Sequence, residues 1–369
     1  MREKQGEKEK KRTRYHDYSL VVIIIFLLCF GLVMLYSTSS YNAQLKFNDS
    51  TYYLRKQLEA VILGLFGMIV VSHIPYHFWQ RISVLVFVVS VVLCWLVFSP
   101  LGIERNGSRR WIGYNNFSFQ PSELAKIGVI IFMAALICKM QKQMGSLKKL
   151  AQMLVPFLFV IAPVAISNLS TAIIMVGILF MMVFVASPKT SRLIVLALVG
   201  VAALSVFLLI ESYRLERVQV WLHPEEYEKG YQTLQGLYAI GSGGLFGKGL
   251  GESMQKLGFV PEAQNDMIFS IICEELGIFG AVCVILLFLM MIWRFMVIAN
   301  NASDLFGSLV VTGIMAHISL QVVLNIAVVT NTIPNTGVTL PFISYGGTSV
   351  SILLSEMGLA LAVSRGIKL

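Results

Sequence analysis

The residue of this chain best placed for chemistry is a carboxylate at the edge of an apolar run. Asp266 lies in VPEAQNDMIF, residues 260–269, and the apolar run continues through ICEELGIFGAVCVILLFLMMIW. Burial beside apolar groups raises a carboxylate pKa towards neutral pH, which suits a general base. A carboxylate at a helix start is also stabilised by the helix dipole, without any chemistry. The residues alone leave both interpretations open.

Three further carboxylates lie near Asp266 in the sequence. Glu262 is close enough to share its site, and a divalent cation such as Mg²⁺ or Mn²⁺ could bind there, with Asp266 as a ligand. Glu274 and Glu275 would lie roughly 12 Å further along a helix, at 1.5 Å per residue. Adjacent helical residues face about 100° apart, so both are not expected to line one cavity. We expect structural roles for Glu274 and Glu275.

Cations gather in SRRWIGYNNFSFQPSELAK, residues 108–126. Pro121 suits the first turn of a helix, and Glu123 lies three residues before Lys126, where the two can pair. Arg109, Arg110 and Lys126 together could bind an anionic headgroup, because guanidinium groups match phosphate oxygens. Helix capping and snorkelling of long basic side chains are the alternative.

Two other ligand classes are not expected. GSGGLFGKGLG, residues 241–251, contains no GxxxxGK[ST] and follows no strand pattern, so we predict no nucleotide site. The net charge of +9 comes from scattered loops and one tail, so nucleic acid is not an expected partner. The five cysteines lie in or beside apolar runs and are interpreted as small buried side chains.

The elements that must position these residues are membrane helices. Hydrophobic residues make up 56% of the 369, only 13% are charged, and the mean hydropathy is +0.75. A soluble domain carries about 25% charged residues. The composition therefore predicts an all-α polytopic membrane protein, embedded by about ten transmembrane helices. The expected spans lie near 18–37, 57–75, 82–100, 122–138, 151–167, 170–187, 192–211, 268–296, 307–330 and 347–364.

Charge sets the expected topology. Lys and Arg in 1–14, 139–149, 189–192 and 365–368 place both termini in the cytoplasm by the positive-inside bias. Residues 1–17 form a basic tail, expected to be disordered, and 18–369 form a single domain of ten helices. Within it, 213–267 is expected to be a large extracellular loop between the seventh and eighth spans. Prolines in the fifth span favour half-length or tilted fifth and sixth helices, and the Pro- and Gly-rich 331–349 favours a re-entrant segment.

Four stretches resemble signatures of the SEDS family, the shape, elongation, division and sporulation proteins FtsW, RodA and SpoVE. They are RRWI…FQPSELAK, GYQTLQGLYAIGSGGLFGKGLG, PEAQNDMIFSIICEELG and PNTGVTLPFISYGGTS. The resemblance covers nearly the whole chain from Tyr18 onward and is closer to FtsW or SpoVE members than to RodA. The essential family aspartate falls on Asp266, the arginine before its tryptophan on Arg110, and the lysine of its QPSE motif on Lys126. The HTD common in the family is QND here, with Gln264 in place of the histidine.

The resemblance implies a peptidoglycan glycosyltransferase that polymerises lipid II into glycan strands at the outer face of the bacterial cytoplasmic membrane. Asp266 would be the general base of an inverting displacement. Arg109, Arg110 and Lys126, with Glu123 and Glu262 beside them, would bind the substrate and its undecaprenyl pyrophosphate. The implied partners are the nascent glycan strand, a class B penicillin-binding protein and division-complex proteins at the septum.

Two other functions remain open at this point. Broken helices and intramembrane charges also suit a lipid II flippase or another lipid-linked transporter. A scaffold that only recruits division proteins is the third hypothesis, and it would not need Asp266. Septal, elongation and sporulation roles are not separated by these motifs.

Overall fold

The computed structural model describes residues 17–367 apart from 106–107, 115–116, 188–199 and 201–211. Its helices are α1 (Tyr18–Phe47), α2 (Tyr52–His73), α3 (Tyr76–Arg81), α4 (Ser83–Leu96), α5 (Pro121–Met140), α6 (Leu147–Ser167), α7 (Leu169–Ala186), α9 (Ser212–Leu222), α10 (Tyr231–Gly243), α11 (Ile268–Asn300), α12 (Leu305–Val329) and α13 (Gly347–Ser364). Its strands are β1 (Gly102–Arg105), β2 (Ser108–Tyr114) and β3 (Phe117–Phe119).

The helices form where the apolar runs were predicted. Within the described residues, six helices are long and apolar enough to cross a membrane: α1, α6, α7, α11, α12 and α13. Nine of the ten expected spans overlap described helices, and the seventh, 192–211, lies outside the described residues except for residue 200. The total of ten spans therefore stays a prediction.

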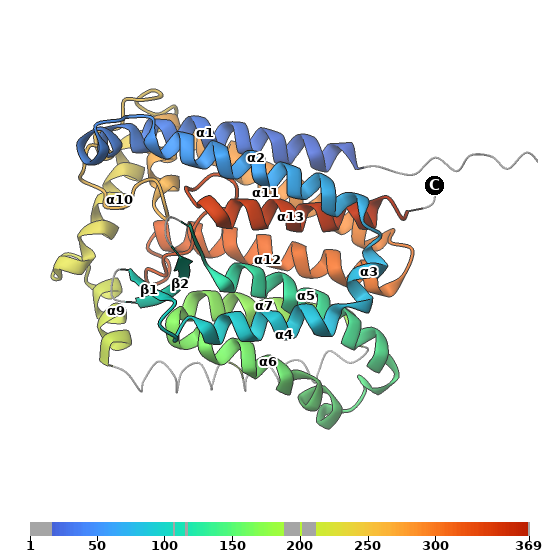
Figure 1. The fold of residues 1–369 in the computed structure, drawn as a ribbon. Coiled ribbons are helices and arrows are strands. Elements are labelled where there is room, and N and C mark those ends of the chain that lie inside the picture. Colours follow the sequence, from blue (N-terminus) through green and yellow to red (C-terminus); the bar gives the residue numbers. More distant parts are fainter. Residues whose placement is uncertain (1–16, 106–107, 115–116, 188–199, 201–211, 368–369) are drawn as a thin grey trace, which may run out of the picture.

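The bundle is arranged around α12 and α13. Figure 1 shows these two helices between α1 and α2 on one side and α4 to α7 on the other. α13 packs against α2, and α12 packs against α11, α7 and α5. The site described below therefore takes side chains from the central helix α12 as well as from the end of the bundle.

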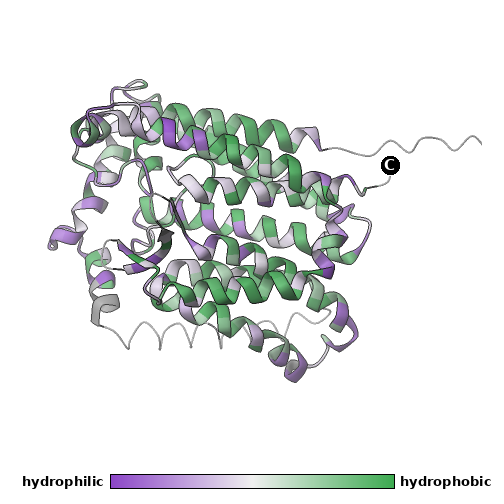
Figure 2. Ribbon diagram, viewed as in Figure 1, coloured by the Kyte–Doolittle hydropathy of each residue, from purple (hydrophilic) through white to green (hydrophobic). Residues whose placement is uncertain are grey.

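The two ends of the bundle differ in what they carry. The strands, α9 and α10 lie at one end, whereas α1 begins and α13 finishes at the other (Figure 1). Hydrophilic residues gather at both ends and hydrophobic ones along the helices (Figure 2). This is the distribution expected when helix middles face hydrocarbon and the connections face water.

The structure refines two expectations about local structure. α6 runs through Pro156 and Pro163 for 21 residues, about 31 Å at 1.5 Å per residue, and α7 has 18 residues, so the half-length alternative is wrong for both. The break between them is at Asn168 alone. The described chain is mostly helical, as expected, and residues 102–119 add a three-stranded antiparallel sheet in the order β1-β2-β3. Its strands have only four, seven and three residues, too few for a long alternating pattern.

Two irregular segments are held against the helices by hydrogen bonds from other parts of the chain. Residues 331–346 contain no helix and pack against other parts of the protein, as expected for a segment of this composition. Gln57 Nε2 donates to the Ser344 carbonyl at 3.2 Å, and the Tyr345 amide donates to the Gln264 carbonyl at 2.9 Å. The second segment, 244–258, follows α10 and is held by α11.

α11 is interrupted at Gly277, whose φ of 67° lies in the left-handed region that favours glycine. The loop after α10 takes over the hydrogen bonds that the interruption frees. The amides of Ile278 and Phe279 donate to the carbonyls of Gly244 and Leu245 at 2.9 and 3.0 Å. A Cβ at 277 would lie 2.4 Å from the Gly247 nitrogen, so no other residue fits without a shift.

Candidate active site

Asp266 stands two residues before α11, where three segments meet. The Asn325 side chain on α12 fixes its backbone: Nδ2 donates to the Asp266 carbonyl at 2.8 Å and to the Val338 carbonyl at 2.7 Å. Asn325 is fully buried. One amide therefore ties the turn before α11 and the 331–346 segment to α12, which holds the Asp266 side chain at a defined place.

The Asp266 carboxylate itself is weakly bonded. It accepts from Gln232 Nε2 on α10 at a long 3.4 Å, and Gln232 Oε1 accepts from Asn335 Nδ2 at 3.4 Å. On its other side lies the backbone of Gly337, where a Cβ would be 3.9 Å from Oδ2. The side chain is only partly exposed. The backbone amides of Asp266 and Met267 also act on the carboxylate, but within the described residues it has no ion-pair partner, so it can still accept from a ligand.

The surroundings of Asp266 raise its pKa from 3.8 to about 6. Loss of hydration is the largest cause, and the negative charge of Glu262 adds to it. Backbone amides and the Gln232 side chain act in the opposite direction. A carboxylate with this pKa is ionised at neutral pH and is basic enough to accept a proton, which is what a general base requires.

Glu262 influences Asp266 by charge rather than by contact. It is exposed, its side chain accepts a hydrogen bond from Asn265 Nδ2, and its φ of 52° is left-handed, which is uncommon outside glycine. The structure places Glu262 close enough to raise the pKa of Asp266 by its charge, without a direct hydrogen bond between the two carboxylates.

The two arginines of β2 have different surroundings. Arg110 Nε donates to the Ser167 carbonyl at 2.8 Å, at the end of α6. Arg109, on the alternate face of the strand, is 51% exposed and its Nε lies 3.7 Å from Glu104 Oε2. Arg110 is thus positioned by the bundle, whereas Arg109 is a surface residue of the sheet.

Lys126 and Glu123 form the pair that their spacing predicted. Lys126 Nζ lies 2.9 Å from Glu123 Oε1, and the lysine side chain is 2% exposed against 13% for the glutamate. Neither makes a direct hydrogen bond with Asp266 in the part of the chain described. An anion bound by Lys126 would therefore have to share this lysine with Glu123.

A chain of contacts joins the arginine region to the Asp266 region. After Ser167, whose carbonyl binds Arg110, the α7 residue Ser170 donates its hydroxyl to the Thr336 carbonyl at 2.8 Å. Thr336 precedes Gly337, the neighbour of Asp266. The start of α7 and the 331–346 segment thus connect the region of Asp266, the predicted base, with that of Arg110.

The sequence did not indicate several residues that bond to Asp266 or to the 331–346 segment. Gln232 and Asn325 are polar groups whose role depends on partners 34 and 59 residues away. Arg217 NH1 and Trp221 Nε1 on α9 donate to the carbonyls of Asn335 and Asn331 at 3.3 and 2.9 Å. The available signal in the sequence was Asn325, an asparagine within the mainly apolar α12.

Glu274 and Glu275 are structural, as expected. Both are fully buried. Glu274 accepts from Lys248 Nζ at 2.6 Å, from Ser253 and from two backbone amides of the loop. Glu275 accepts from Lys256 Nζ at 2.8 Å and from Ser37 on α1 at 2.7 Å. The two carboxylates fasten the 244–258 loop to α11 and α1.

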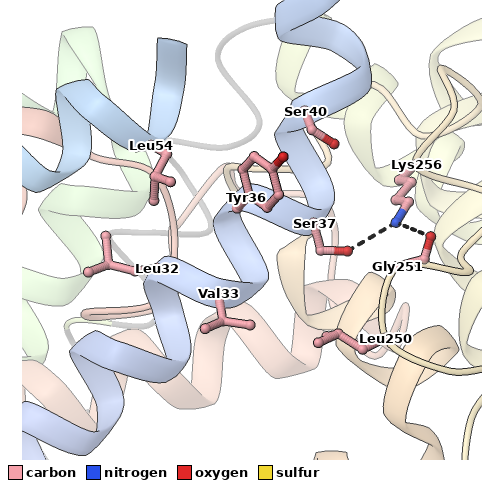
Figure 3. A pocket seen from close by; sticks show the side chains of 9 residues that line it. All are labelled: Leu32, Val33, Tyr36, Ser37, Ser40, Leu54, Leu250, Gly251 and Lys256. Atoms are coloured by element: carbon pink, nitrogen blue, oxygen red, sulfur yellow. Dashed lines mark hydrogen bonds between the residues drawn. The ribbon is translucent and has the colours of Figure 1, made fainter. Parts of the chain in front are cut away.

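Lys256 also borders a pocket of about 580 Å³ between α1, α2 and this loop. Figure 3 shows its ammonium group turned towards Ser37 and the Gly251 carbonyl, at 3.0 and 2.6 Å. Glu275 takes the third donor, so Lys256 has no proton left for a ligand. The walls are mainly apolar: Leu32, Val33, Tyr36, Leu54 and Leu250.

The sequence of this chain is similar to those of known proteins over nearly its whole length. A family model described as "Cell cycle protein", for FtsW, RodA and SpoVE, matches residues 18–368. Stage V sporulation protein E of Bacillus subtilis is 41% identical, covering 95% of this chain and 97% of its own length. A probable peptidoglycan glycosyltransferase FtsW of Trichlorobacter lovleyi is 38% identical, covering 97% and 95%.

Solved structures agree with the sequence matches. A chain from a study of polymerization and crosslinking by a peptidoglycan synthase complex superposes with a TM-score of 0.78 and 26% identity, over 95% of this chain and 98% of that one. The rod shape determining protein RodA of Thermus thermophilus gives 0.69 and 26%, over 95% and 97%.

Proposed function

Because the chain belongs to the FtsW, RodA and SpoVE family of cell cycle proteins, we propose that it polymerises lipid II with Asp266 as the general base. Its relatives match over nearly their whole lengths, and the chain is a peptidoglycan glycosyltransferase of the cytoplasmic membrane. The observation that carries the assignment of the base is the weakly bonded carboxylate of Asp266, with its pKa of about 6.

Asp266 would act on the acceptor sugar. Its carboxylate takes the proton of the 4-hydroxyl of the N-acetylglucosamine of lipid II, so that the O–H bond breaks as the oxygen attacks the donor. The oxygen bonds to the anomeric carbon of the donor muramyl sugar, and the bond to the lipid pyrophosphate breaks. The donor linkage is α and the product β, so one displacement with inversion completes the transfer without a covalent enzyme intermediate.

The departing pyrophosphate needs positive charge in a site with little water. Arg110 and Lys126 are our candidates, because one is anchored at the α6–α7 junction and the other is buried in α5. Glu123 would release Lys126 in part when the pyrophosphate binds. Arg109, at the exposed face of the sheet, would contribute at longer range, and Glu262 would face the acceptor side.

A divalent cation also fits this site. Mg²⁺ commonly binds through one or two carboxylates together with substrate phosphates, and Asp266 has lone pairs available for it. Asp266, with Glu262 nearby, would hold Mg²⁺ or Mn²⁺, which when bound would offset the charge of the pyrophosphate. A separate cluster, His223, Glu225 and Glu226, brings three ligand atoms together but is exposed beyond α9.

The wider role proposed is septal synthesis together with a class B penicillin-binding protein. The superposed peptidoglycan synthase chain, whose study concerns polymerization and crosslinking, supports such a partner. The alternative is a lipid II flippase or another lipid-linked transporter, and the same experiment separates the two.

The test uses the purified full chain in lipid bilayers with a class B penicillin-binding protein, labelled lipid II and Mg²⁺. We expect glycan strands, resolved by gel electrophoresis and shortened by a muramidase. In parallel vesicles, accessibility of the labelled headgroup reports translocation. Translocation without any polymer would overturn the proposal in favour of the transporter.

A further inference from the structure

One face of α12 carries three polar side chains deep in the bundle. His317, Gln321 and Asn325 are spaced four residues apart, so they lie above one another on the same side of the helix. Their exposed fractions are 1%, 7% and 0%. From Asn325 to His317 the helix rises about 12 Å, at 1.5 Å per residue. This α12 polar face (His317, Gln321, Asn325) begins at the carbonyl of Asp266 and leads into the bundle.

Each member satisfies one end of its side chain and leaves the other without a protein partner. Asn325 uses Nδ2 on Asp266 and Val338, and Gln321 uses Nε2 on the Thr339 carbonyl at 3.1 Å. The opposite atoms, Asn325 Oδ1, Gln321 Oε1 and His317 Nε2, are buried and have no hydrogen-bond partner in the described part of the protein. A buried polar atom left unsatisfied is unfavourable, because it has given up its hydrogen bonds to water without replacing them.

Such atoms are concentrated around this face. Within the described residues, ten buried side-chain polar atoms lack a partner, and six of them belong to the polar face or to residues adjoining Asp266. The other three of the six are on Gln264, Asn265 and Thr336. Buried groups of this kind are ordinarily satisfied by internal water, which makes two to four bonds each. Successive turns are about 6 Å apart, a gap that one bridging water spans with two bonds of about 2.8 Å.

The face ends at a buried ionisable pair. His317 Nδ1 lies 2.9 and 3.0 Å from the two carboxylate oxygens of Glu356 on α13, and Glu356 is 1% exposed. Glu356 thus engages Nδ1 and leaves Nε2 as the ring nitrogen without a protein partner in the described residues.

The other charged groups on the helices around α12 are already paired or exposed. On α5, Glu123 and Lys126 pair with each other and Lys139 is exposed. On α11, the two glutamates bind Lys248 and Lys256, and Arg294 binds Asp17. The described α7, Leu169–Ala186, has no charged residue. Glu356 is therefore the ionic partner of His317.

We propose that the α12 polar face binds a file of internal water molecules that connects the turn at Asp266 with the His317–Glu356 pair. These waters bridge Asn325 Oδ1, Gln321 Oε1 and His317 Nε2, the three buried atoms of the face that lack a protein partner in the described residues.

Hydroxyl-radical footprinting tests the water file without any activity. Radicals formed by radiolysis of bound water oxidise the side chains beside it, even where bulk solvent does not reach. In the full chain in lipid nanodiscs, we expect His317 to be oxidised at least about fivefold faster than Phe157 or Phe288, after correction for intrinsic reactivity. Both phenylalanines are as deeply buried. Oxidation of His317 at the phenylalanine level would show a dry contact and overturn the proposal.

Substitutions sharpen this measurement. Gln321→Leu replaces the middle polar group by an apolar one of similar size and is expected to bring His317 oxidation down to the phenylalanine level. Val323→Leu, on the exposed side of α12 at 62%, is the matched control and should change nothing. Equal His317 oxidation in all three proteins would place the labelling water outside the α12 polar face.

Discussion

The carboxylates on either side of residue 267 have opposite surroundings. Asp266 accepts one long side-chain hydrogen bond and keeps part of its surface open, whereas Glu274 and Glu275 are fully buried and bonded to lysines, hydroxyls and amides. The side-chain chemistry is the same in both regions. The number of donors around it differs, and that number separates a group free to react from a group that holds the fold.

The variant expected to lose the most activity is the one that removes the proposed base. Asp266→Asn keeps shape and the Gln232 contact but removes the base, so we expect glycan formation to fall roughly 10²–10⁴-fold. The thermal unfolding midpoint should stay at the wild-type value, because the carboxylate makes little contact. Full activity would remove Asp266 from its role, and a large drop in the midpoint would make it structural like Glu275.

The corresponding change at the structural carboxylate Glu275 is expected to lower stability. Glu275→Gln leaves the buried ammonium of Lys256 without its counter-charge, which costs about 3–5 kcal/mol. Thermal unfolding in detergent measures this. The double variant Glu275→Gln, Lys256→Met should regain much of the loss, since it removes both charges. The exposed pair Lys56 and Glu59 is the control, and Glu59→Gln should be close to neutral.

The pH dependence of the rate of glycan formation tests whether Asp266 is the general base. Below its pKa of about 6 the carboxylate is protonated and cannot accept a proton, so the rate should fall about tenfold per pH unit on the acid side. Glu262→Gln removes a charge that raises this pKa and should move the acid limb to lower pH. An acid limb that stays in place would mean that another group sets the profile.

The smallest effects come from the two arginines of β2, which form a matched pair. Arg110→Gln loses the anchored guanidinium and should lower the rate about tenfold, since its charge is positioned near the site. Arg109→Gln changes an exposed side chain and should alter the rate less than about twofold. Equal losses would show that the sheet binds substrate with both faces.

The parts of this fold that depend on local pattern could be predicted from the sequence. Apolar runs located the helices, and the three-residue spacing located the Glu123–Lys126 pair. The half-length alternative for α6 was wrong because its two prolines are accommodated within a continuous helix of the bundle. The sheet was missed because its strands are too short to show an alternating pattern.

Residues that depend on distant partners could not be predicted in the same way. Glu356 lies 39 residues from His317, and Asn325 lies 59 from Asp266, so no spacing within one helix indicates either contact. Gln232 likewise reaches Asp266 only because α10 folds back over the turn before α11. The base was identifiable from its own neighbours in sequence, whereas the groups that orient it were not.

The interruption of α11 at Gly277 has a mechanical consequence. The nine residues from Ile268 to Leu276 form a separate helical segment, with Asp266 just beyond one end and Gly277 at the other. Lys248 and Lys256 tie the 244–258 loop to this segment through Glu274 and Glu275. A protein bound to that loop would therefore bear on the segment that leads to the carboxylate.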